Sequence, residues 1–152
     1  MADWTAHTTT EATPEQLLEV LTHPEEIRRW SPVDFDLEDL RSSRLTAGTR
    51  TRVTGKLAGI SMGFDVEVKA ADEAGLQLTA DGPIGLDVRY DMAPGPEGNE
   101  LHASVSVRRG GGITGRLVAN ATTALLSAGA LDGATGRIAR AAETSPAYAL
   151  AA

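Results

Sequence analysis

The fold class of this chain follows from residues 101–143, which read LHASVSVRRGGGITGRLVANATTALLSAGALDGATGRIARAAE. From Leu101 to Arg108, apolar and polar residues alternate, which is typical of a strand with one buried face and one solvated face. Apolar and small residues then recur at steps of three and four between Ile113 and Glu143, which predicts one long amphipathic helix. A strand that leads into such a helix predicts an α+β domain in which the helix covers one face of a sheet.

Four glycines interrupt the helical pattern: Gly115, Gly129, Gly133 and Gly136. Each costs on the order of 1 kcal/mol relative to alanine inside a helix. They therefore indicate a close backbone approach, a bend or a break, and three of the four lie after Ser127.

Upstream, the period-two alternation extends back to Asp34, and glycine-containing breaks divide it into about six strands of an antiparallel meander. Residues 13–16, TPEQ, start a short helix, because threonine caps it, proline takes its first position and glutamine follows three residues after the cap. A second short helix starts at residues 23–26, HPEE, and ends at Ser31–Pro32. The predicted order is a strand, two short helices, the meander and a long helix.

At 152 residues the chain fits one domain. We expect this domain to span residues 1–144 and residues 145–152 to form a flexible tail. Residues 1–10 lack the charged start and apolar core of a signal peptide, and no apolar run approaches the roughly 20 residues that cross a bilayer. We therefore expect a cytoplasmic protein without a membrane partner.

The composition excludes several classes of function. The formal net charge of −7 repels phosphate backbones and argues against a nucleic-acid partner. Cysteine is absent, so disulfides, thiolate nucleophiles and sulfur-ligated metals are excluded. His7, His23 and His102 lack the spacing of a metal site. We expect no cofactor and no metal.

The order of elements resembles that of the START-like superfamily, also called the SRPBCC or polyketide cyclase/dehydrase group. The resemblance is carried by residues 13–25, TPEQLLEVLTHPE, by Trp30-Ser31-Pro32, by residues 45–50, LTAGTR, and by the terminal helix. It implies a helix-grip fold, in which a curved antiparallel sheet of about seven strands wraps around a long C-terminal helix. It also implies a ligand site between the concave face of the sheet and that helix.

Carried onto this chain, the resemblance implies a mostly apolar pocket with two polar candidates, Tyr90 and Asn120. The implied lining residues are Trp30 near the mouth, Phe64, Val66, Val88, Tyr90, Met92, Ala103, Val105, Leu117, Asn120, Ala121 and Leu125. Pockets for small ligands are typically apolar with a few placed polar groups. Three of these residues also have a purely structural interpretation: Tyr90 as a core aromatic, Trp30 as a plug under the short helices, and Asn120 as a helix-boundary residue.

We interpret the chain as a protein that binds a small hydrophobic molecule, polyketide-like or lipid-like, in bacterial secondary metabolism. Its role there would be sequestration, transport or self-resistance. The alternative is an enzyme, a polyketide cyclase or aromatase that acts in the same pocket. No acid–base couple stands out on the apolar face, so no catalytic residue is assigned. A third class of protein in the superfamily binds another protein. For the oligomeric state of this chain, we expect a monomer or a weak homodimer.

Residues 108–113, RRGGGI, join the last strand to the helix. As a helix N-terminus beside two arginines, this segment is either a site for an anionic group of a ligand or a flexible turn. The resemblance extends to START-like proteins of actinobacterial enediyne pathways, which protect their producer by being cleaved at glycine. It makes Gly82, Gly85, Gly111 and Gly112 candidates for such cleavage.

Overall fold

The computed structural model describes residues 2–31, 35–38, 44–57, 59–108 and 111–144. Residues 145–152, for which we predicted a tail, lie outside the described residues, and so do Pro32, Arg109 and Gly110.

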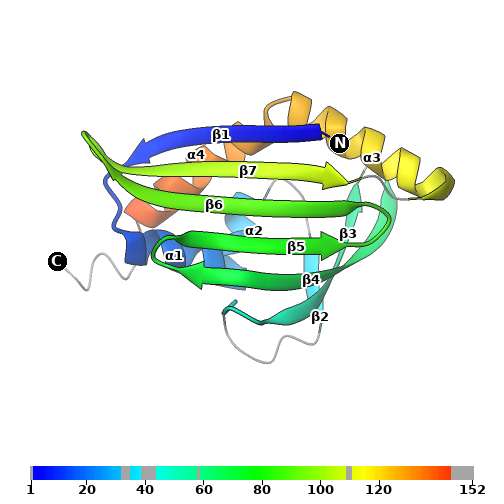
Figure 1. The fold of residues 1–152 in the computed structure, drawn as a ribbon, viewed down its shortest axis with the longest axis horizontal. Coiled ribbons are helices and arrows are strands. Elements are labelled where there is room, and N and C mark those ends of the chain that lie inside the picture. The colour runs from blue at the N-terminus through cyan, green and yellow to red at the C-terminus, as the bar shows by residue number, and fades with distance from the viewer. Residues whose placement is uncertain (1, 32–34, 39–43, 58, 109–110, 145–152) are drawn as a thin grey trace.

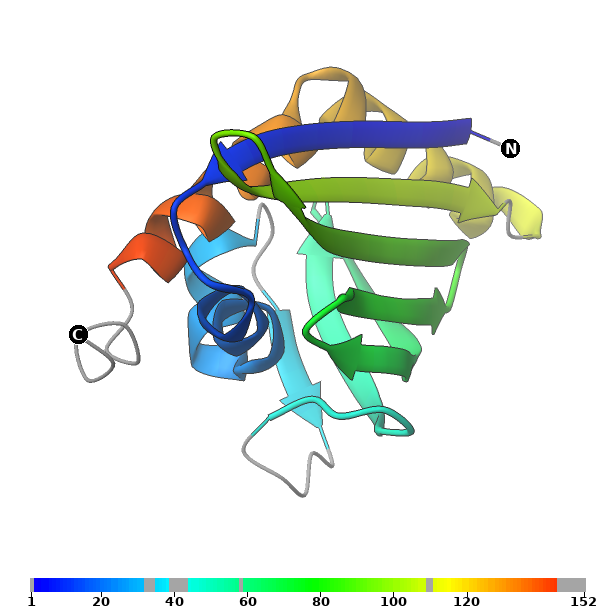
Figure 2. The same cartoon turned by 60° about the vertical axis from the view of Figure 1, so that its left-hand side comes forward.

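Seven strands form one antiparallel sheet in the described part of the chain, as predicted (Figure 1). The strands are β1 (Ala2–Thr10), β2 (Phe35–Glu38), β3 (Arg50–Leu57), β4 (Ile60–Asp72), β5 (Gly75–Asp81), β6 (Gly85–Gly95) and β7 (Gly98–Arg108). They lie in the order β1-β7-β6-β5-β4-β3-β2, so β2 to β7 form a meander and β1 pairs with its last strand. The sheet is curved, and the helices lie on its concave side (Figure 2).

The two short helices after β1 are present, as predicted. α1 (Pro14–Thr22) begins with a complete capping box: the backbone N–H of Gln16 donates to Thr13 Oγ1 over 3.2 Å, and the backbone N–H of Thr13 donates to Gln16 Oε1 over 2.7 Å. α2 (Pro24–Trp30) starts directly after His23, the residue that ends α1. α1 packs against α4 and against β4 and β5, so it closes one end of the concave face.

The prediction of one long helix over Ile113–Glu143 is wrong. The chain forms two helices there, α3 (Gly112–Ser127) and α4 (Ala130–Glu143). They are separated at Gly129, whose φ of +93° lies in the left-handed region that glycine adopts without strain. The concentration of glycine after Ser127 is therefore the signal of a break.

The break changes the face that α3 turns toward the protein. α4 buries the residues that the periodicity predicted for it, Leu131, Thr135, Ile138 and Ala142. α3 instead buries Gly115 and Val118, while Ile113 and Leu117 are 79% and 52% exposed. The periodic pattern assumed one continuous helix, so it assigned the buried face of both segments as if no break lay between them. The predicted buried face is therefore correct for α4, whereas in α3 a different face is buried.

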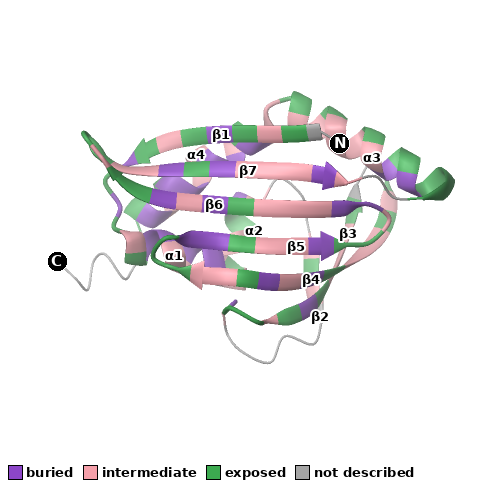
Figure 3. Ribbon diagram, in the orientation of Figure 1, coloured by how far each residue is buried: buried purple, intermediate pink, exposed green. Residues whose placement is uncertain are grey.

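The main hydrophobic core lies between α1, α4 and the part of the sheet that they cover (Figure 3). Its fully buried side chains include Leu17, Leu21, Leu101 and Ile138. A second, smaller cluster is formed by Ile84, Val107 and Val118, the last of which lies on α3. α4 buries six residues and α3 only two, so α3 packs less closely on the sheet.

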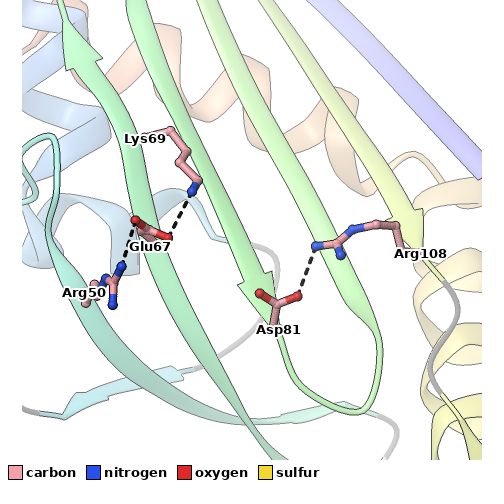
Figure 4. A network of polar contacts seen from close by, with 5 residues as sticks. All are labelled: Arg50, Glu67, Lys69, Asp81 and Arg108. Carbon is pink, nitrogen blue, oxygen red and sulfur yellow. Dashed lines mark hydrogen bonds and ion pairs between the residues drawn. The ribbon is translucent and has the colours of Figure 1, made fainter.

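Ion pairs within and between strands lie on the face of the sheet that points away from the helices (Figure 4). Glu67 on β4 accepts a hydrogen bond from Lys69 Nζ over 3.0 Å and lies 3.4 Å from Arg50 Nη2 on β3. The hydrogen bond from Lys69 is the main reason that the pKa of Glu67 is lowered. Arg108 pairs with Asp81 and Asp87, each over 3.1 Å. Such exposed pairs add little stability, but they favour one strand register and make this face unsuitable for an apolar partner.

Gly129→Ala tests whether the left-handed residue determines the helix break. Alanine at this φ is strained by about 1–2 kcal/mol, and nothing lies within 4 Å of the added Cβ to obstruct it further. We expect the substitution to lower the free energy of unfolding by about this amount in urea titrations. Gly136→Ala is the control, because it lies inside α4, meets only Arg140 Nη1 at 3.6 Å and should gain up to about 1 kcal/mol. Unchanged stability of Gly129→Ala would show that the break does not depend on glycine.

Candidate ligand-binding site

A cavity of about 340 Å³ lies between the concave face of the sheet and the helices. Strands β2 to β7 supply most of its wall, and the end of α2 supplies Trp30 and Ser31. Leu21 of α1, Ile27 of α2 and Leu45 also border it. Both sides of the break at Gly129 contribute as well, with Leu125 and Leu126 of α3 and Leu131 and Ala134 of α4 among the residues. The volume is near the lower end of the roughly 300–1,000 Å³ that small-molecule sites occupy.

Seven of the twelve residues implied by the resemblance lie in the cavity wall. They are Trp30, Phe64, Val66, Val88, Tyr90, Val105 and Leu125. Met92 and Ala103 are buried in the main core instead, because α1 and α4 fill the concave face at their end of β6 and β7. That these seven residues contact a ligand remains a prediction.

The other three implied residues belong to α3 and lie outside the wall. Leu117 and Asn120 are exposed, and Ala121 is half-buried. The rotation of α3 explains all three positions, because it turns Thr122, Leu125 and Leu126 toward the cavity. Asn120 therefore lies at an exposed position of α3, outside the described wall.

Sequence reasoning missed the part of the wall that β5 contributes. Leu76, Leu78 and Ala80 alternate there as Val88 and Tyr90 do on β6, so the same period-two signal identifies them. Thr122 on α3 had no such signal, because its orientation depends on the helix break.

Trp30 is held in place from three sides. Its Nε1 donates a hydrogen bond to the carbonyl of Val20 over 3.0 Å, and its own carbonyl accepts one from Arg137 Nε over 3.1 Å. Its ring meets the ring of Tyr90 edge-on, with centroids 5.8 Å apart and an interplanar angle of 74°. Trp30 therefore links α1, α2 and α4 and also forms part of the cavity wall.

The polar residues of the wall are few. Burial raises the pKa of Tyr90 above its ordinary value, so its side chain stays a neutral phenol. Ser31, Thr51 and Thr122 contribute hydroxyl groups, and Lys56 is exposed. The described wall contains no carboxylate and no imidazole.

The described residues contain neither a cluster of metal ligands nor a helix that could span a membrane. No group of three or more His, Asp or Glu side chains gathers there in a way that could hold a metal ion. His7 and His102 stack on each other at an exposed position with ring centroids 5.6 Å apart, and His23 pairs with Glu19 over 3.4 Å. No described helix is both long enough and apolar enough to cross a membrane.

Arg108, Gly111, Gly112 and Ile113, the described residues of the segment 108–113, are not part of the described wall. Arg108 is engaged with Asp81 and Asp87, and Arg109 lies outside the described residues. The four candidate cleavage sites, Gly82, Gly85, Gly111 and Gly112, also lie outside the wall. Gly55 on β3 is the glycine that the described wall contains.

Comparison with known proteins gives structural matches and no sequence matches. The sequence matches no protein-family model and no curated protein. The structure of TTHA0849 from Thermus thermophilus matches with a TM-score of 0.70 and 14% identity, over 95% of this chain and 99% of that one. KanY matches with a TM-score of 0.67 and 13% identity, over 93% and 97%.

A third match is DynU16, a protein of the dynemicin biosynthetic locus, with a TM-score of 0.58 and 25% identity. The matched region covers 93% of this chain and 47% of DynU16, so this chain spans about half the length of DynU16. Together with the element order, these neighbours show that the chain has the START-like helix-grip fold, as predicted.

The raised pKa of Tyr90 predicts a stability change at alkaline pH. The unfolded chain loses the phenol proton near the ordinary value of 10.0, whereas the folded chain keeps it. The unfolded state then binds fewer protons, so stability is full below this pH and falls as the pH rises above it. We expect the urea midpoint of the parent to fall relative to that of Tyr90→Phe as the pH is raised through 10.0. Parallel pH profiles of the two proteins would mean that Tyr90 ionises as an exposed phenol does.

Proposed function

We propose that this protein binds a small apolar molecule in the cavity between its sheet and the helices α3 and α4. The proposal rests on the composition of the wall, whose described residues are nearly all aliphatic or aromatic and include neither a carboxylate nor an imidazole. Water in such a space has few polar partners, so an apolar ligand that displaces it gains the free energy of leaving bulk water. The helix-grip fold supports the same conclusion, because it sets this cavity between the two layers.

The wall favours a polyketide-like or lipid-like ligand. Four of the chain's six aromatic residues (two Trp, two Tyr and two Phe) border the cavity: Trp30, Phe35, Phe64 and Tyr90. Aromatic rings bury large apolar areas and pack well against flat ring systems. Because Lys56 is the only charged residue of the described wall and is itself exposed, the buried part of the ligand is neutral.

The match to DynU16 supports a role in bacterial secondary metabolism, because that protein belongs to the dynemicin biosynthetic locus. In such a setting the protein would sequester, transport or give self-resistance to a natural product. We propose binding rather than cyclase or aromatase activity, because general acid–base catalysis needs a partner for Tyr90 that can take up a proton. The described wall offers no carboxylate or imidazole for this purpose.

A cavity-filling substitution tests the binding site. Val88→Phe adds a ring to the wall on β6, and we expect it to weaken binding of the neutral fluorescent probe N-phenyl-1-naphthylamine by about tenfold or more. Leu117→Phe is the matched control, because residue 117 is exposed on α3 and should leave probe affinity unchanged. Fluorescence titration measures both, and thermal unfolding checks that the variants are folded. Absence of probe binding by the parent, or equal loss in both variants, would contradict the proposed site.

Native mass spectrometry of the protein purified from a producing bacterium distinguishes binding from turnover. We expect a bound molecule whose mass is unchanged after prolonged incubation with excess protein, and whose amount falls in Val88→Phe. A bound molecule that loses water or is otherwise converted with time would favour the cyclase. Free molecule incubated with Val88→Phe serves as the control for spontaneous conversion.

A further inference from the structure

Tyr90 borders the cavity, and its hydroxyl group has no hydrogen-bond partner among the described residues. The residue is only 5% exposed. A phenol that is buried to this extent normally finds a partner for its O–H group. A buried hydroxyl without one lowers the stability of the fold, so the position is unfavourable unless something else supplies the partner.

The Tyr90 oxygen is unpaired but not sealed in. Among the described residues, three buried side-chain atoms are fully enclosed without a partner: Trp4 Nε1, Gln16 Nε2 and His23 Nδ1. The Tyr90 oxygen is not one of them, so a molecule of the size of water can still reach it. Tyr90 borders the cavity, and we take the cavity to be the space from which its hydroxyl is reached.

The packing around Tyr90 holds the phenol at a defined position. On the sheet, Tyr90 lies between Leu76 of β5 and Ala103 of β7, both of which are buried. The edge-on contact with Trp30 restricts the ring on the helix side, and Trp30 is itself fixed by Val20 and Arg137. The donor is thus oriented before a ligand arrives, which lowers the entropy lost on binding.

A neutral carbonyl oxygen is the group that fits this donor. Burial raises the pKa of Tyr90, so the phenol keeps its proton and donates. A carbonyl group only accepts, and one donor satisfies it. An alcohol would bring its own O–H group into an apolar wall and would need a second partner there.

We infer that the cavity selects apolar molecules that carry a neutral carbonyl oxygen, held by a hydrogen bond from Tyr90, over the corresponding hydrocarbons. The inference rests on the proposed binding function and narrows its ligand class to aromatic and aliphatic ketones and related carbonyl compounds. A site built around a hydrogen bond discriminates against a ligand that lacks the matching group, because the protein donor is then left buried and unpaired.

A matched pair of ligands tests the inference: 2-acetylnaphthalene, which carries the carbonyl, and 2-ethylnaphthalene, which differs by its absence. Affinities are measured by displacement of N-phenyl-1-naphthylamine from the parent, from Tyr90→Phe and from Thr122→Val. Thr122→Val is the control, because it removes a different wall hydroxyl with little change of shape. We expect the parent and Thr122→Val to prefer the ketone by about threefold to tenfold, and Tyr90→Phe to bind both compounds equally.

The outcomes separate this inference from the proposed function. If both compounds bind the parent equally, or if Tyr90→Phe keeps the preference for the ketone, the inference is overturned while apolar binding stands. If the preference is lost in Thr122→Val and kept in Tyr90→Phe, the donor has been misassigned and the inference is overturned as well. If neither compound nor the probe binds the parent, the proposed function fails and the inference fails with it.

Discussion

The rest of this structure depends on how one apolar face of a curved antiparallel sheet is covered. An antiparallel meander that alternates apolar and polar residues needs a cover on one side only. α4 supplies most of it, because its buried residues join those of α1 and the sheet in a single core. Polar contacts hold this cover in place: Thr10 on β1 donates to Glu143 at the end of α4, and Arg137 of α4 donates to the carbonyl of Trp30.

The cavity follows from the uneven cover. α3 precedes α4 across a left-handed glycine and buries only two residues, Gly115 and Val118, among those that the structure describes, so it covers its part of the concave face less completely. Empty apolar volume lowers stability, because the residues around it lose contacts that a filled core would provide. A ligand that binds the folded state alone recovers part of that stability. The less closely packed region and the cavity thus both lie beside the break in the helix.

Trp30 and Tyr90 connect the packing of the fold with the chemistry of the cavity. Trp30 joins three helices through its hydrogen bonds and presents its ring to Tyr90, which adds a neutral phenol to a mostly apolar wall. Charged residues are concentrated away from the cavity. Many of them form exposed ion pairs on the opposite face of the sheet. The two faces of one sheet therefore have different roles, which the alternation of residues along each strand makes possible.

The sequence by itself determined the local structure, because strand alternation, the TPEQ capping box and the glycines after Ser127 act between residues that are near in the chain. It also predicted the cavity positions on the strands, such as Val88 and Tyr90, since a period of two leaves just two faces to choose from. Tertiary structure alone decided the rotation of α3, which exposes Leu117 and Asn120, and the boundary that places Met92 and Ala103 in the core. Both depend on where α1 and α4 pack, and on a single left-handed residue, rather than on any periodicity. Tertiary structure alone also decided that the hydroxyl of Tyr90 has no partner among the described residues. Whether a buried hydroxyl finds a partner depends on every element packed around it, and the sequence of its own strand does not reveal this.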